Sequence, residues 1–122
     1  MAPGLGPWLL ALSLAAGPAG LWAQLRLLEA GGGHRASGDS VTLLCRGVGQ
    51  NFDIHGVYWY RELAGGRLER LSFISYDSSV IRLGQSVEGR AAVSRDNYKF
   101  ESSLSLLVLN PRDSARYFCA VR

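Results

Sequence analysis

The sequence predicts a single all-β domain built as a β-sandwich, and three observations lead to that prediction. Its 122 residues leave room for one domain. Apolar residues alternate with polar ones in short segments, and clusters of Gly, Asn, Asp and Ser separate these segments. No stretch of ten or more residues combines helical periodicity with capping residues. Short alternating strands with frequent turns are typical of a two-sheet sandwich.

The first 23 residues, MAPGLGPWLLALSLAAGPAGLWA, contain no charged side chain and centre on the apolar run WLLALSLAA. This composition predicts a secretory signal peptide over residues 1–23, cleaved after Ala23, although no basic residue precedes the run. A membrane-spanning helix is the weaker alternative, because Pro18 and Gly20 interrupt the run before it could cross a bilayer. The mature domain would then occupy residues 24–122.

Three later segments show the alternation of a half-buried strand. The residues expected to face inward are Val41, Leu43 and Cys45 in SVTLLC, Leu104 and Leu106 in SLSLL, and Tyr117 and Cys119 in RYFC. Serines occupy the opposite face of SLSLL, and Phe118 lies on the reverse of RYFC. Two strands far apart in the sequence therefore each place a cysteine on an inward face.

Cys45 and Cys119 are the only cysteines, and in a secreted chain they most simply form one disulfide. Closing a loop of this length stabilises a fold by roughly 4 kcal/mol in the chain-entropy description. A metal site is a poor alternative, because His34 and His55 form no ligand spacing with either cysteine. Trp59 follows Cys45 by fourteen positions and is expected to pack near the disulfide if its N–H finds a partner.

These residues resemble the immunoglobulin variable domain, whose hallmarks are a Cys…Trp…Cys spacing and a tyrosine two positions before the second cysteine. Cys45, Trp59, Tyr117 and Cys119 match this pattern. The segments QLRLLEAGGG and SVEGRAAVSRDN look like antibody heavy-chain frameworks, whereas WYRE and DSARYFCAVR look more like a T-cell receptor α or δ variable segment. The resemblance spans Gln24 to Arg122 and implies a V-type, Greek-key sandwich with Trp59 and Tyr117 in its core.

The chain ends in CAVR, three residues after Cys119. Germline variable segments of the family stop at this boundary, and a joining segment then supplies the last strand. The resemblance therefore implies an incomplete domain over residues 24–122 that lacks its final strand and the rest of the third hypervariable loop. A V-set adhesion or signalling receptor would instead carry its own final strand, and this alternative stays open.

By resemblance, recognition belongs to loops at one end of the sandwich. The implied antigen-binding residues are Asn51, Phe52, Asp53, Ile54 and His55 in the first loop, Tyr76, Asp77 and Ser78 in the second, and Ala120, Val121 and Arg122 at the start of the third. For Phe52 a position in the core is the alternative. Arg90 and Asp113 correspond to the framework ion pair of the family, a structural feature expected to contribute little if it is exposed.

The resemblance also implies a face that pairs with a second variable domain, formed by Tyr60, Glu62, Leu68, Arg70 and Phe118. Two residues depart from the usual pattern, because glutamine commonly stands at the position of Glu62 and heavy chains place tryptophan at that of Arg70. Burying these charges unpaired is costly. The expected partner is therefore a T-cell receptor β or γ variable domain rather than an antibody light chain.

The implied function is recognition of antigen or peptide–MHC by a T-cell receptor α- or δ-like variable domain, with a heavy-chain-like immunoglobulin segment as a further alternative. An enzyme is not expected, because the chain has neither a nucleophile motif nor a phosphate loop. No cofactor and no nucleic-acid partner are expected, since its basic residues are scattered. The domain is expected to be extracellular, held at the plasma membrane through a constant region that is not present in this chain.

Overall fold

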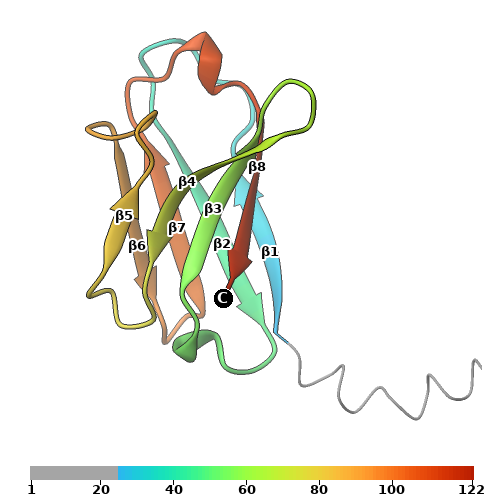
Figure 1. Ribbon diagram of the computed structural model, residues 1–122, viewed down its shortest axis with the longest axis vertical. Helices are drawn as coiled ribbons and strands as arrows, with labels where there is room; N and C mark the ends of the chain where they lie inside the picture. The colour runs from blue at the N-terminus through green and yellow to red at the C-terminus, as the bar shows by residue number, and fades with distance from the viewer. Residues whose placement is uncertain (1–24) are drawn as a thin grey trace, which may run out of the picture.

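Residues 25–122 are described by a computed structural model, and they form two antiparallel four-stranded sheets packed face to face (Figure 1). The predicted signal peptide, residues 1–23, lies outside the described residues. The first sheet has the strand order β1 (Arg26–Gly31), β2 (Val41–Val48), β7 (Glu101–Leu106), β6 (Ala91–Asp96). The second has the order β5 (Ile81–Leu83), β4 (Leu68–Ile74), β3 (Val57–Glu62), β8 (Arg116–Val121). The predicted all-β sandwich is confirmed.

Alternation along the strands builds the core as predicted. In β2, Leu43 and Cys45 are buried, while Thr42 and Leu44 are exposed. In β7, Leu104 and Leu106 are buried against the other sheet, and the intervening serine is only partly buried. Each strand therefore contributes one apolar face to a core between the sheets, because successive side chains point to opposite sides.

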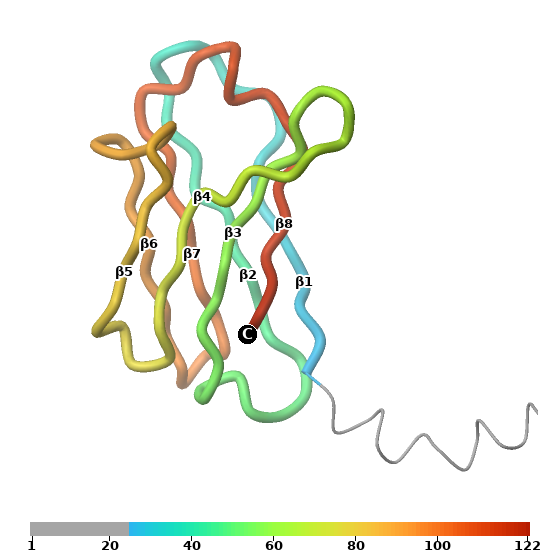
Figure 2. The backbone as a smooth tube through the Cα atoms, in the orientation of Figure 1, coloured from blue at the N-terminus to red at the C-terminus, as the bar shows by residue number. Residues whose placement is uncertain are grey.

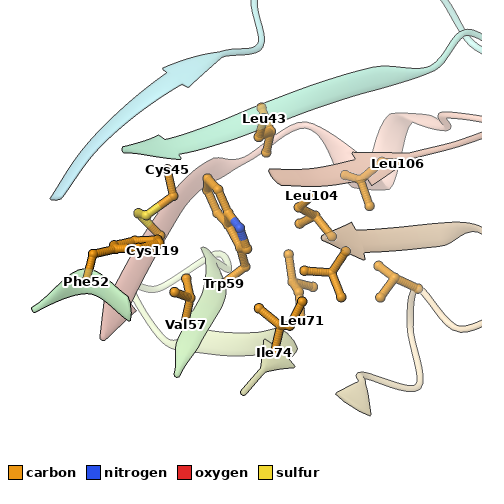
Figure 3. Close-up of a cluster of buried hydrophobic side chains, with 12 residues drawn as sticks. Leu43, Cys45, Phe52, Val57, Trp59, Leu71, Ile74, Leu104, Leu106 and Cys119 are labelled. Carbon is orange, nitrogen blue, oxygen red and sulfur yellow. A yellow bond between two sulfur atoms is a disulfide. The ribbon is translucent and has the colours of Figure 1, made fainter. Parts of the chain in front are cut away.

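The predicted disulfide joins the two sheets through this core. Cys45 of β2 and Cys119 of β8 are bonded, with their Cα atoms 6.2 Å apart. The indole of Trp59, from β3, lies beside the bridge and is 1% exposed (Figure 3). Cys119 of β8 stands directly opposite Trp59 of β3, so the pairing of these strands places the largest core side chain next to the disulfide.

The indole N–H of Trp59 was expected to find a hydrogen-bond partner, but it makes no hydrogen bond within residues 25–122. Leaving a buried donor without a partner costs about 1–3 kcal/mol. An aromatic side chain of this size removes about 200 Å² from water, which at about 25 cal/mol per Å² stabilises the fold by about 5 kcal/mol. Burial therefore outweighs the missing hydrogen bond.

The order of the strands decides where the connections lie. The chain crosses between the sheets from β2 to β3, from β5 to β6 and from β7 to β8. As a result, the β2–β3, β4–β5 and β6–β7 connections lie at the same end of the sandwich as the C-terminal end of β8 (Figure 2). The β3–β4 and β7–β8 connections lie at the opposite end.

Candidate functional site

The loop end of the sandwich consists of residues 49–56, 75–80 and 97–100 together with the end of β8 (Figure 2). It includes the first and second loops expected from the sequence, and a third connection, β6–β7, that was not among the expected site residues. A single-turn 3₁₀ helix, Phe52–Ile54, shapes the β2–β3 connection. Its N-cap, Asn51, adopts a left-handed conformation with φ 70°, which asparagine tolerates better than most residues.

Arg95 holds these connections together from beneath. Its Nη1 donates to the carbonyl oxygens of His55 at 2.7 Å and Ser75 at 2.9 Å, and its Nη2 donates to that of Phe52 at 2.9 Å. Its guanidinium also lies 4.7 Å from the ring centroid of Phe52. One side chain of β6 thus fixes the backbone of both the β2–β3 and the β4–β5 connections.

The turn after β6 adds a second tie. Asn97 Oδ1 accepts a hydrogen bond from Arg95 Nε at 2.8 Å, and Asn97 Nδ2 donates to the carbonyl of Tyr76 at 2.9 Å. Burial lowers the pKa of Arg95 below its ordinary value, while the charges of Asp53 and Asp77 oppose this shift. A guanidinium stays protonated despite such a shift. Arg95 was missed from the sequence, although it follows Val93 by two positions and therefore faces inward.

Phe52 is a core residue and not a contact residue, which corrects its place among the implied antigen-binding residues. It is 1% exposed and belongs to the same buried cluster as Trp59. Gly47 of β2 makes room for it, because a Cβ atom at Gly47 would lie 2.6 Å from Cδ1 of the Phe52 ring. The 3₁₀ turn therefore directs the Phe52 side chain into the core and leaves the neighbouring side chains facing solvent.

Ile54 and Tyr76 are the large side chains that the first and second loops present outward, 62% and 53% exposed respectively. Asp53 is also exposed. Asp77 is occupied within its own turn, because Oδ1 accepts hydrogen bonds from Ser75 and from the backbone and hydroxyl of Ser79. Those hydrogen bonds lower the pKa of Asp77.

The end of β8 departs from the expected third loop. Ala120 and Val121 lie in the strand, and Val121 packs against the core, so neither belongs to a loop. Arg122 follows the strand and is exposed. Its Nη1 donates to the hydroxyl of Tyr58 at 3.1 Å, and its carbonyl oxygen lies 2.6 Å from Nδ1 of His55.

Asp113 anchors the opposite end of the sandwich. Arg90 binds its carboxylate with two hydrogen bonds of 2.7 and 2.8 Å, and Arg61 adds one of 3.0 Å. The backbone N–H of Asn110 donates to Oδ2 at 3.0 Å, and the hydroxyl of Tyr117 donates to the carbonyl of Asp113 at 2.6 Å. The last contact is a tyrosine corner.

The framework pair of Arg90 and Asp113 is part of a larger, mostly buried cluster, so the small contribution expected of an exposed pair does not apply. Asp113 and Arg61 are 7% and 6% exposed, and Arg61 also donates to Glu69 at 2.7 Å. Burial alone would raise the pKa of Asp113, but hydrogen bonds from Arg90, the Asn110 backbone and Arg61 lower it to about 2. Burial likewise acts to lower the pKa of Arg61, but hydrogen bonds to Tyr117, Glu69 and Asp113 raise it.

A hollow of about 370 Å³ lies beside the Asp113 cluster, between the turn after β1 and the segment from Leu109 to Tyr117. The hollow lies at the end of the sandwich opposite the loop end. Asp113 contributes the carboxylate that lines this hollow. Two arginines already bind this carboxylate, so the role of Asp113 is structural. Within residues 25–122, no three His, Cys, Asp or Glu side chains are grouped so that they could hold a metal ion.

The residues expected on the pairing face all lie on the outer surface of the second sheet. Tyr60 of β3 stands opposite Arg70 on one side and Phe118 on the other. Glu62 stands opposite Leu68 and Arg116 in the next pair along the strand. The pairing of β3 with β4 shifts register between Trp59 and Tyr60, and this irregularity lets Leu71 and Ser72 both turn inward while Arg70 faces out.

A family model for the immunoglobulin V-set domain matches residues 34–122 of this chain. The match covers well over half of the chain and includes both sheets apart from β1. No helix in the described part of the chain has the length and apolar character needed to span a membrane. The bridge between Cys45 and Cys119, the buried Trp59 and the tyrosine corner of Tyr117 are the hallmarks of this fold. The chain therefore belongs to the immunoglobulin V-set family.

Proposed function

We propose that this protein is an antigen-binding variable domain of a lymphocyte antigen receptor, of the T-cell receptor α or δ type. Its ligand is peptide–MHC or another antigen. The observation that carries the proposal is the loop end, where Arg95 secures two connections from below and leaves Ile54 and Tyr76 facing solvent. Binding residues are typically found on loops that a rigid scaffold positions.

The chemistry of the loop end supports binding rather than catalysis. Tyrosine provides a large, amphipathic contact at low entropic cost, and the exposed side chains of Asn51 and Ser78 provide adaptable hydrogen bonds. Ile54 is more exposed than Tyr76 and lies on the neighbouring loop. Fixing the loop backbone beforehand reduces the ordering entropy lost on binding, which improves affinity without new contacts.

The proposal includes a partner and a location. The outer face of the second sheet, with Tyr60, Glu62, Leu68, Arg70 and Phe118, pairs with the variable domain of a T-cell receptor β or γ chain. The receptor acts outside the cell, held at the plasma membrane through a constant region. Membership of the V-set family supports this location, because such domains are typically extracellular.

Co-expression tests the proposal. The chain, joined through a joining segment to a T-cell receptor α constant region, is expressed in a T-cell line without its own α and δ chains, together with a β or γ chain. We expect a surface receptor with one of these chains, detected by flow cytometry, and no stable product with an antibody light chain. Assembly with the light chain, but with neither the β nor the γ chain, would contradict the proposal.

Recognition is tested on the same cells with a panel of peptide–MHC tetramers. We expect the double variant Ile54→Ala, Tyr76→Ala to lose tetramer staining at least tenfold while its surface level stays unchanged. The matched control is Val108→Ala, because Val108 is 65% exposed but lies in the β7–β8 connection at the other end. Equal loss in both variants would show that the loop end is not the recognition surface.

A further inference from the structure

The outer face of the second sheet is strongly basic, and the register of its strands defines which residues it contains. Three rows of directly opposed residues face outward. The rows are Arg82, Phe73, Tyr58 and Ala120; then Arg70, Tyr60 and Phe118; then Leu68, Glu62 and Arg116. Arg122 continues the outward positions of β8 and contacts Tyr58. The face therefore carries four arginines and one glutamate, a local net charge of 4 − 1 = +3.

Two of the four arginines lie over aromatic rings of the same face. Arg70 lies 5.7 Å from the ring centroid of Tyr58, and Arg116 lies 5.2 Å from that of Phe118. Tyr58 in turn packs on Phe73, with ring centroids 4.7 Å apart. Cation–π contacts of this kind hold a guanidinium against the surface while its N–H groups remain free to bind an anion.

Only one of these cations has an acidic neighbour within the described residues. Arg116 lies 3.7 Å from Glu62, a pair in which the arginine side chain is 76% exposed. Arg70, Arg82 and Arg122 form no salt bridge within residues 25–122. Within residues 25–122, three guanidiniums of the basic face thus have no carboxylate at salt-bridge distance.

We propose that this basic face docks a second variable-type domain whose own sheet face presents carboxylates opposite Arg70, Arg82 and Arg122. The inference rests on the proposed function, which assigns pairing to this face, and adds the chemistry of the partner. A neutral partner would strip water from three arginines without replacing their hydrogen bonds, a strongly unfavourable change. Carboxylates can accept two parallel hydrogen bonds from each guanidinium, and this geometry favours one register of docking.

A second copy of this chain is the wrong partner on the same grounds. An isologous dimer brings the same patch of both copies together, so two faces of charge +3 would oppose each other. Like charges at an interface select against such a partner. Charge complementarity therefore predicts a heterologous pair with an acidic face and a monomeric chain when it is alone.

Charge reversal on the chain itself supplies a probe of known structure. The acidic-face variant Arg70→Glu, Arg82→Glu, Arg122→Glu changes the charge of the face from +3 to −3. Its matched control, Arg26→Glu, Arg35→Glu, Arg46→Glu, reverses three exposed arginines on the first sheet and the turn after β1, with the same change in net charge. Circular dichroism and urea unfolding verify that both variants fold.

Analytical ultracentrifugation at 50 mM salt then compares the wild type, each variant, and equal mixtures of the wild type with each variant. We expect a dimer only in the mixture with the acidic-face variant, weakened at least tenfold at 500 mM salt because exposed charges are screened. Equal assembly with the control variant, dimerisation of the wild type alone, or no assembly in any mixture would overturn the inference.

Failure of the proposed function and failure of the acidic-partner inference can be distinguished. If the wild type forms surface receptors with β or γ domains, and Arg70→Gln with Arg82→Gln leaves the surface level within twofold, pairing is correct and the acidic partner is wrong. If neither β nor γ chains assemble but the charge-reversed mixture does, the face is a docking surface and the receptor assignment fails.

Discussion

Replacing Asp113 with asparagine tests whether the buried charge cluster, rather than the shape of the carboxylate, stabilises the sandwich. Asparagine keeps nearly the same volume but carries no charge. Asp113 accepts hydrogen bonds from Arg90, Arg61 and the Asn110 backbone, and all three lower its pKa. In the variant, Arg61 stays buried with Glu69 as its remaining acidic partner.

The size of the expected loss can be worked out in two ways. The pKa of Asp113 falls from 3.8 to about 2 on folding. A shift of this size corresponds to about 2–3 kcal/mol of stability at neutral pH, at about 1.4 kcal/mol per unit. Removing one member of a buried ion pair costs about 3–5 kcal/mol, because the other charge stays buried. We therefore expect Asp113→Asn to lower the free energy of unfolding by about 2–5 kcal/mol, a large part of the stability of a typical domain.

The same pKa shift predicts a dependence on pH. The folded pKa lies below the unfolded one, so the stabilisation is fully present above 3.8 and disappears as the pH falls through about 2. The difference between wild type and variant should therefore shrink across this interval. Wild-type stability itself should decline over the same range.

Urea unfolding of the purified chain at a series of pH values measures both effects. Glu62→Gln is the control, because its partner Arg116 is exposed and 3.7 Å away, and it should change stability by no more than about 1 kcal/mol. If Asp113→Asn stays within about 0.5 kcal/mol of wild type at pH 7, or if the difference persists at pH 2, the cluster does not act as argued.

Two further predictions concern the loop end. Phe52→Ala should lower the free energy of unfolding by about 3–5 kcal/mol, whereas Ile54→Ala on the same turn should change it by no more than about 0.5 kcal/mol; equal losses in urea titrations would contradict the assignment of Phe52 to the core. Arg95→Ala should speed amide hydrogen exchange at least tenfold in residues 49–56 and 75–80 but not around Asp113, and unchanged protection there would exclude the anchoring role.

The sequence by itself determined the sandwich and its central bridge. Strand alternation has a period of two, so inward and outward positions can be assigned from neighbours alone, as for Leu43, Cys45 and Leu104. In a chain predicted to be secreted, two inward cysteines leave one simple pairing. The same rule could have identified Arg61 and Arg95, which follow Trp59 and Val93 by two positions on inward faces.

Tertiary structure alone decided what these inward arginines bind. Arg61 binds Glu69, 8 positions away on the neighbouring strand, but also Asp113, 52 positions away. The carbonyls that bind Arg95 lie between 20 and 43 positions away, so no local pattern contains Asp113 or these carbonyls. Phe52 lies in a turn, where no strand period fixes the direction of a side chain. Arg70 faces outward only because the β3–β4 pairing shifts register at Trp59, and such an irregularity arises from the fit between two strands.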